Sequence, residues 1–205
     1  MTEVGTGVAI GRATRDDVPA LAGTLAAAFQ DDPVMRWWIG DGAERAAILP
    51  RFFGFAVEHQ YLRYEEVHVA DRADGVAAWC PPGRWRPPED ELAALAPGYF
   101  ESIGEHHFAR GAVIVALIEE RHPARPHWYL PFIGVRPDRQ GNGIGSALLA
   151  HMEARLDAEG LPAYLEASSE RNRALYVRHG FDVTGEVRLP DGPPMWLMWR
   201  EPKEA

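Results

Sequence analysis

Residues 134–146 read GVRPDRQGNGIGS and decide how we expect this chain to fold. The apolar stretch Trp128–Val135 before them has the composition of a buried strand, and residues 143–159 carry the apolar stripe of a helix. Pro137 ends the strand in a turn. Three alternate glycines, from Gly141 to Gly145, then permit a tight bend without Cβ atoms. The bend opens on a helix N-terminus, where unpaired N–H groups and the helix dipole favour an anion such as phosphate.

Two familiar phosphate-binding loops fit this stretch poorly. A Walker loop requires a lysine after its last glycine, and none is present here. A dinucleotide-binding fingerprint needs a glycine three places after Gly143, where Ser146 stands, although Glu166 lies at a suitable distance for a ribose contact. A turn that binds nothing remains the alternative for the loop by itself, because a lone Gly-x-Gly is weak evidence.

The composition predicts one globular domain over residues 1–205. Hydrophobic residues make up 46% and charged residues 25%, so a core forms without staples. Cys80 is the only cysteine, which fits a reducing, cytoplasmic compartment. The net charge of −9 argues against nucleic acid as a partner. Residues 1–5 lack the basic and apolar regions of a signal peptide, and no apolar run reaches the roughly 18 residues of a membrane helix, so we expect no membrane partner.

Apolar periodicity and turn residues predict the other elements. The first helix starts at Thr14 or Asp16, and Asp32-Pro33 stops it after Phe29. The expected strands are residues 8–13, 66–70, 76–80, 128–135, 163–167, 181–188 and 195–199. The further expected helices are residues 43–59, with Pro50 as a kink, 92–109, interrupted at Pro97-Gly98, 113–120, 143–159 and 172–179. This order predicts an α/β fold with one mixed sheet and helices on both faces.

A second segment decides between the interpretations of the loop. Residues 140–145 read QGNGIG and residues 172–181 read NRALYVRHGF. In these segments the chain resembles the GNAT superfamily of N-acetyltransferases, whose acyl-CoA signature is Gln or Arg followed by x-x-Gly-x-Gly or Ala. In its second signature, Asn and Tyr precede a Gly-Phe pair. The resemblance covers residues 128–200, and a closer likeness to the puromycin N-acetyltransferases rests on residues 13–19, 24–29 and 189–193.

The resemblance implies a GNAT-like domain, with a mostly antiparallel sheet and a splayed strand pair, that uses acetyl-CoA as donor. Pro131 is awkward in a central strand because it removes a ladder hydrogen bond, and a bulge or splay between Pro131 and Gly134 resolves this. Such a gap is where the family inserts its cofactor. The residues expected to bind the cofactor are Ile133, Gly134, Val135, Gln140, Gly141, Asn142, Gly143, Ile144, Gly145, Ser146 and Asn172.

Two residues are candidates for the chemistry. Tyr176 lies four residues after Asn172, on the same helix face, and its protonated phenol would donate a proton to the departing thiolate. The alternatives are that Tyr176 only packs the helix on the sheet and that Asn172 only caps it. Glu166 is the candidate general base, through water; it would otherwise pair with an arginine, or the amine would lose its proton without a dedicated base.

The acceptor side is harder to interpret. In relatives, the loop after the first helix lines this side, so Asp31, Asp32 and Trp37 are weak candidates for holding a cationic substrate. Asp-Pro is also ordinary turn chemistry. No His-Glu-x-x-His or paired-carboxylate pattern is present, and we expect no metal.

The predicted function is acetyl transfer from acetyl-CoA to a primary amine of a small molecule. A peptide or protein N-acetyltransferase and a non-catalytic acyl-CoA sensor are the alternatives, and a homodimer through the last strands stays open.

Overall fold

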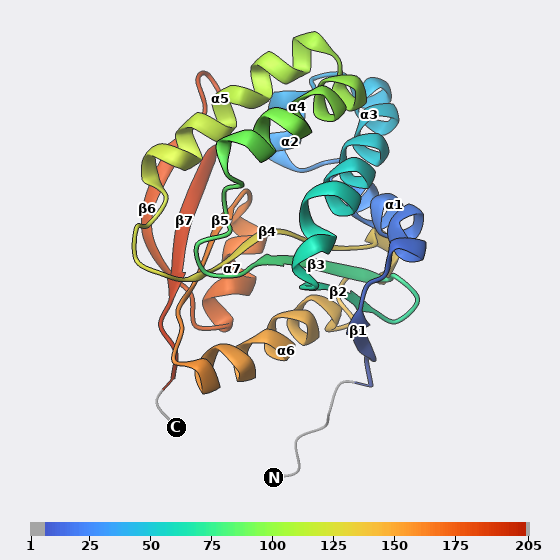
Figure 1. The fold of residues 1–205 in the computed structure, drawn as a ribbon. Helices are drawn as coiled ribbons and strands as arrows, with labels where there is room; N and C mark the ends of the chain where they lie inside the picture. The colour runs from blue at the N-terminus through green and yellow to red at the C-terminus, as the bar shows by residue number, and fades with distance from the viewer. Residues whose placement is uncertain (1–6, 204–205) are drawn as a thin grey trace.

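The structure is a computed structural model that describes residues 7–203, and residues 1–5, where we expect no signal peptide, lie outside this range. A seven-stranded sheet forms the middle layer and helices cover both of its faces (Figure 1). No helix between residues 7 and 203 has both the length and the apolar character needed to cross a membrane. The predicted α/β class with one mixed sheet is confirmed.

The strand order in the sheet is β1-β2-β3-β4-β5-β7-β6. Each neighbouring pair is antiparallel except β4 and β5, which are parallel. The parallel pair is joined through a helix, as a parallel connection requires. The strands are β1 (Ile10–Arg12), β2 (Val67–Ala70), β3 (Gly75–Cys80), β4 (Trp128–Val135), β5 (Ala163–Ala167), β6 (Asp182–Arg188) and β7 (Pro194–Arg200).

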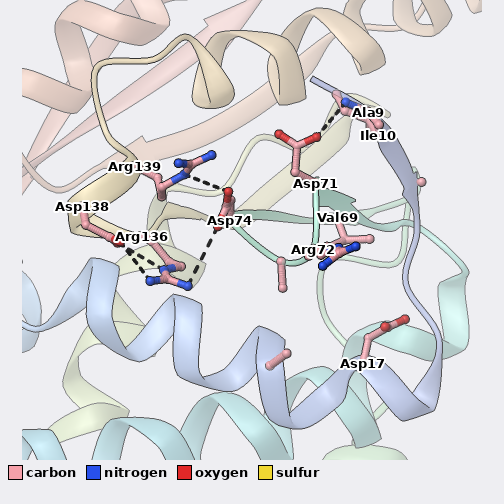
Figure 2. A pocket seen from close by; sticks show the side chains of 13 residues that line it. Ala9, Ile10, Asp17, Val69, Asp71, Arg72, Asp74, Arg136, Asp138 and Arg139 are labelled. Atoms are coloured by element: carbon pink, nitrogen blue, oxygen red, sulfur yellow. Dashed lines mark hydrogen bonds and ion pairs between the residues drawn. The ribbon is translucent and has the colours of Figure 1, made fainter. Parts of the chain in front are cut away.

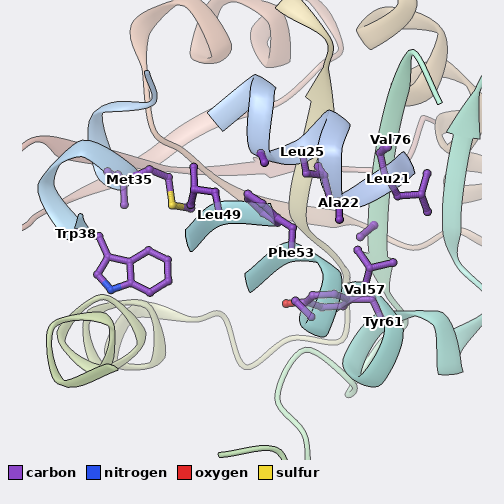
Figure 3. Close-up of a cluster of buried hydrophobic side chains, with 14 of the residues drawn as sticks. Leu21, Ala22, Leu25, Met35, Trp38, Leu49, Phe53, Val57, Tyr61 and Val76 are labelled. Atoms are coloured by element: carbon purple, nitrogen blue, oxygen red, sulfur yellow. The ribbon is translucent and has the colours of Figure 1, made fainter. Parts of the chain in front are cut away.

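Two hydrophobic clusters bury the two faces of the sheet. The larger cluster lies under the N-terminal helices, where Leu21 and Leu25 meet Leu49, Phe53 and the sheet (Figure 3). That face carries α1 (Val18–Phe29), α2 (Pro33–Trp38), α3 (Gly42–Phe55), α4 (Glu89–Ile103) and α5 (Glu105–Arg121). The other face carries α6 (Ile144–Glu159) and α7 (Glu170–Arg178). Short helical turns complete the chain as η1 (Arg15–Asp17), η2 (Ala56–Tyr61), η3 (Leu62–Tyr64) and η4 (Pro137–Arg139).

Strand β4 contains a bulge at the proline that the sequence marks as awkward. Phe132 pairs with Ala78 and Tyr129 pairs with Cys80, so Leu130 and Pro131 together oppose the single residue Trp79. A bulge tolerates proline because one residue of the bulged strand is left out of the ladder. The predicted irregularity is therefore present, one residue earlier in the chain than expected.

The same strand separates from its parallel neighbour. β4 pairs with β5 only at Trp128–Ala163 and Tyr129–Tyr164, although both strands continue beyond these residues. We call this divergence the splay. On its other edge β4 stays paired with β3 up to Val135. The backbone of β4 beyond Tyr129 therefore has a strand neighbour on one edge only.

One helix prediction is incomplete and another is wrong. Asp32-Pro33 does not only stop α1: the Asp32 carboxylate accepts hydrogen bonds from the backbone N–H groups of Val34 and Met35 and so begins α2. The break between α4 and α5 lies at Gly104, with φ of 79°, and not at Pro97-Gly98. Gly98 continues α4 because its missing Cβ makes room for Phe55, whose ring carbon would otherwise lie 2.0 Å away.

Arg45 fixes the segment that connects α1, α2 and α3. Its side chain is buried, and its guanidinium donates to the carbonyl oxygens of Gln30 at 2.6 Å, Ile39 at 2.6 Å and Gly40 at 3.1 Å. These carbonyls follow the ends of α1 and α2, where the helix dipole favours a cation. Arg45 thus holds in place the loop that carries Asp31 and Asp32 and the helix α2 that carries Trp37.

Candidate active site

The centre of the candidate site is the β4 backbone at the splay. Three of its residues are predicted to bind the cofactor. The side chains of Ile133 and Val135 point to the sheet face that α6 and α7 cover. Gly134 faces α1, where an added Cβ would lie 2.9 Å from the Cβ of Ala28. Glycine is therefore required for α1 to pack this closely on β4. Main-chain N–H and C=O groups on the edge facing the splay are available to an extended ligand.

The glycine loop, residues 140–146, connects β4 to α6. Gly141 and Gly143 have φ of 83° and 81°, a region that other residues rarely adopt. The Gln140 side chain donates to the carbonyl of Val135 at 3.1 Å, and that of Asn142 donates to the carbonyl of Arg139 at 3.0 Å. These two contacts hold the loop in shape. The first N–H groups of α6 then point out of the helix without intrahelical partners, as an anion site requires.

Helix α7 places the two residues of the second signature. Its N-cap is Ser169, whose hydroxyl oxygen accepts from the Asn172 backbone N–H at 3.2 Å, so Asn172 is not the cap. Tyr176 follows one turn later and is buried against Phe181. Burial raises the pKa of the Tyr176 phenol, and the nearby Asp32 carboxylate raises it further. Tyr176 is therefore protonated at neutral pH and available as a proton donor.

Glu166 lies on β5, just beyond the last residue that pairs with β4. Alternation along β5 turns Leu165 and Ala167 toward α6 and α7, and Tyr164 and Glu166 toward the opposite face. Tyr129 donates its hydroxyl hydrogen to Glu166 Oε2 at 2.8 Å. Glu166 Oε1 is buried as well, and the Tyr164 hydroxyl lies close enough to lower the pKa of this carboxyl. The arginine pairing that the sequence left open is absent within residues 7–203.

The environment of Glu166 sets its acid–base chemistry. Burial raises the pKa of the Glu166 carboxyl from 4.5 to about 7, and hydroxyl groups of Tyr129 and Tyr164 partly oppose this. A carboxyl with a pKa near neutrality is well matched to the task of a general base. The sequence did not identify Tyr129 and Tyr164, because only the parallel register of β4 and β5 brings them together.

The three predicted acceptor residues lie between the end of α1 and the end of α2, and their environments differ. Asp32 is buried and already engaged: it caps α2 and accepts a short hydrogen bond from the Ser168 hydroxyl. Asp31 and Trp37 line a small pocket of about 430 Å³ beside the β6–β7 turn. One face of the Trp37 ring is covered by the Arg110 guanidinium, 4.2 Å from the ring centroid, and its indole N–H donates to the Pro190 carbonyl at 2.9 Å.

A larger pocket lies elsewhere, between the start of α1, strand β1, the β2–β3 turn and η4 (Figure 2). Its volume is about 1190 Å³. Four of the charged residues on its wall pair with one another, Asp74 with Arg139 at 2.8 Å and Asp138 with Arg136 at 2.9 Å. Size alone therefore does not identify the site, and we place it at the splay.

Residues 64–181 match the acetyltransferase (GNAT) family, which is more than half of the chain. The chain belongs to this family. The match includes β4, the glycine loop, Glu166 and Tyr176. The GNAT resemblance inferred from the two signatures is thereby confirmed.

Individual GNAT relatives support the assignment over nearly the whole chain. An uncharacterized N-acetyltransferase of Schizosaccharomyces pombe is 28% identical, over 94% of this chain and 83% of that protein. A solved structure from Corynebacterium glutamicum, described as histone acetyltransferase HPA2 and related acetyltransferase, is 30% identical with a TM-score of 0.73, covering 97% of this chain and 98% of the other. The Drosophila melanogaster polyamine N-acetyltransferase, 13% identical with a TM-score of 0.63 over 95% and 99% of the two chains, shows the shared fold.

Within residues 7–203, no group of three or more His, Cys, Asp or Glu side chains is arranged to hold a metal ion. The site described above consists of backbone groups, one carboxyl and three phenols.

The raised pKa of Glu166 predicts a pH-dependent contribution to stability. The folded carboxyl, with a pKa of about 7, binds its proton more tightly than the unfolded one at 4.5. This stabilisation is therefore complete below about pH 4.5 and is lost as the pH rises through about 7. We compare the free energy of unfolding of the unmodified chain with that of Glu166→Gln at each pH. From pH 4.5 to pH 8, we expect this difference to change by about 3 kcal/mol to the disadvantage of the unmodified chain.

Chemical denaturation of both proteins across this pH range tests the expectation. Glu170→Gln, at an exposed position on α7, is the matched control and should follow the unmodified chain. Parallel pH curves for the unmodified chain and Glu166→Gln would show that Glu166 keeps an ordinary pKa.

Proposed function

We propose that this GNAT acetyltransferase transfers the acetyl group of acetyl-CoA to a primary amine of a small molecule. The observation that carries the proposal is the splay, where β4 has a free backbone edge between the glycine loop and Glu166. A ligand that combines an extended amide-containing arm with a pyrophosphate matches this sequence of backbone groups and helix N-terminus. CoA has both parts.

The donor would lie along β4 toward α6. Backbone groups of Ile133, Gly134 and Val135 would pair with the pantetheine arm, and the N–H groups of residues 140–146 would bind the pyrophosphate. Asn172 on α7 would hydrogen-bond the arm, since Ser169 already serves as the helix cap. The thioester would then lie in the splay, between Glu166 and Tyr176.

The reaction would proceed by direct attack. The nitrogen lone pair of the neutral amine forms a bond to the thioester carbon, and the carbon–sulfur bond breaks with its electron pair going to sulfur. Glu166 accepts the proton that the attacking nitrogen loses, and Tyr176 gives its phenol proton to the departing thiolate. The proton gained by Glu166 balances the proton lost by Tyr176, so solvent exchange restores both groups.

The acceptor would enter from the face that carries α1 to α5, because Glu166 projects to that face. The Drosophila melanogaster enzyme named above forms N-acetylagmatine, and another structure of the same fold is an agmatine N-acetyltransferase. Both support a small amine as acceptor through fold alone. The likeness to puromycin N-acetyltransferases stays a prediction, and puromycin belongs among the amines to be tested.

The glycine loop generates the first prediction for this function. We expect Gly143→Glu to abolish CoA binding, since the new carboxylate lies where the pyrophosphate binds. Gly160→Glu is the matched control: it introduces the same charge at a glycine of similar backbone conformation, with φ of 65° against 81°, at the opposite end of α6. Isothermal titration calorimetry with CoA measures both. Equal affinity in the two variants would contradict the assignment of the loop.

Tyr176 generates the second prediction and separates an enzyme from a sensor. A thiol-release assay with acetyl-CoA and a panel of amines, puromycin included, should reveal turnover by the unmodified chain. Tyr176→Phe should lower kcat by about a hundredfold or more while leaving the CoA affinity within a fewfold. CoA binding without release of thiol from any amine would favour the non-catalytic acyl-CoA sensor, and unchanged kcat in Tyr176→Phe would remove the proton-donor role.

A further inference from the structure

The turn between β2 and β3 has a strained backbone. It covers residues 71–74, and two of them, Asp71 and Ala73, have φ of 40° and 70° although neither is glycine. Residues with a Cβ rarely adopt this left-handed region, and they stay in it only where surrounding contacts hold them. The contacts of this turn therefore show which parts of the molecule it is fixed to.

The first part of the turn is held by the N-terminal segment and by α1. The Asp71 carboxylate accepts from the Ala9 backbone N–H at 3.1 Å, and the Asp71 N–H donates to the Ala9 carbonyl at 2.8 Å. The Thr24 hydroxyl, which is buried on α1, donates to the Ala73 carbonyl at 2.6 Å. The turn is thus fixed on one side before the chain reaches Asp74.

Asp74 joins the turn to the segment that precedes the glycine loop. Its backbone carbonyl accepts from the Arg136 N–H at 3.0 Å (Figure 2). Its carboxylate pairs with Arg139 Nε at 2.8 Å and, more distantly, with Arg136 at 3.9 Å. Arg136 precedes η4 and Arg139 ends it, immediately before Gln140. One acidic residue therefore contacts both ends of the segment that leads into the loop.

Gly75, the next residue, contacts the other end of the glycine loop. A Cβ on Gly75 would lie 2.5 Å from Ile144 Cγ2 and 3.0 Å from Leu148 Cδ1, so glycine is required for this close approach. Ile144 is the first residue of α6. Two consecutive residues thus contact both sides of the bend at residues 140–143, Asp74 before it and Gly75 after it.

Apolar packing contributes little to the position of η4. Residues 136–139 are all exposed, and three of them line the pocket of about 1190 Å³ together with Asp74. Asp138 pairs with Arg136 of the same segment and so adds no link to the turn. The Asp74 side chain, in contrast, is only 16% exposed. Its ion pair with Arg139 is therefore well placed to decide where the segment lies.

We propose that Asp74 is a positioning residue for the cofactor, which by holding Arg139 keeps the glycine loop in the shape that binds the pyrophosphate of CoA. This inference rests on the proposed function, because it takes the loop as the pyrophosphate site. Arg139 transmits the effect to the loop, since its carbonyl accepts from the Asn142 side chain at 3.0 Å. A loop that already has its binding shape loses less conformational entropy when the ligand binds. Asp74 thus acts on the affinity for CoA and not on the transfer step.

Two substitutions in the same ion pair test the inference, because they change the charge in opposite directions. Asp74→Asn removes a negative charge and Arg139→Gln removes a positive one, but both break the pair. We expect each to weaken CoA binding roughly tenfold in isothermal titration calorimetry. The double variant should bind CoA about as weakly as either single variant, because the pair is already lost. Unfolding midpoints show whether the variants are folded.

Asp138→Asn is the matched control. It removes the same charge as Asp74→Asn from the residue next to Arg139, but the link to the turn stays intact. Its CoA affinity should remain within about twofold of that of the unmodified chain, since an exposed ion pair contributes little. In the thiol-release assay, Asp74→Asn should raise the KM of acetyl-CoA and leave kcat at saturating acetyl-CoA nearly unchanged.

Three results would overturn the inference. Unchanged CoA affinity in both single variants would leave the pair a structural role alone. Tighter binding by Asp74→Asn together with weaker binding by Arg139→Gln would show that charge, and not the shape of the loop, is the cause. A lower kcat of Asp74→Asn at unchanged CoA affinity would also contradict it.

The same measurements separate this inference from the proposed function. CoA binding that depends on the pair, without acetylation of any amine, would support the inference while the proposed function fails. If the unmodified chain does not bind CoA, both fail.

Discussion

The site depends on the bulge and divergence of β4. The additional residue opposite Trp79 turns Tyr129 and Phe132 to the same face, although they are three positions apart, and removes Pro131 from the regular ladder. Immediately beyond Tyr129, the strand leaves β5 while it keeps its pairing with β3. A regular parallel pairing to the end of β5 would saturate the backbone groups that we assign to the donor.

The splay also connects the two faces of the sheet. The helix dipole of α6 and the buried Tyr176 belong to one face, while Glu166 belongs to the other. Because β5 alternates, one strand can present Leu165 and Ala167 to α7 and still project Glu166 toward the acceptor helices. Donor and acceptor can then approach the same point from opposite sides. Burial also raises the pKa of Glu166, which makes its carboxylate a stronger base than a solvated one.

The features that the sequence predicts well are local ones. Glycine spacing predicts the turn between the strand at residues 128–135 and the helix that follows it without tertiary information, and Pro131 predicts an irregular strand. The anion site at residues 140–146 stays a prediction. The missed features depend on context. Asp32-Pro33 is equally suited to end one helix or begin another, and the structure uses it to begin α2. Gly98 is a helix breaker by propensity, but packing against Phe55 keeps it inside α4. Tyr129 and Tyr164 are 35 residues apart, and only the register of β4 on β5 makes them neighbours of Glu166.

Amide hydrogen exchange with and without CoA tests the central claim most directly, because it reports on backbone groups without any substitution. The account predicts slower exchange on CoA binding for β4 beyond Tyr129 and for residues 140–146, with no change in β2 and β3 at residues 67–80. Protection confined to the pocket between α1 and the β2–β3 turn, or no protection of β4 at saturating CoA, would contradict it.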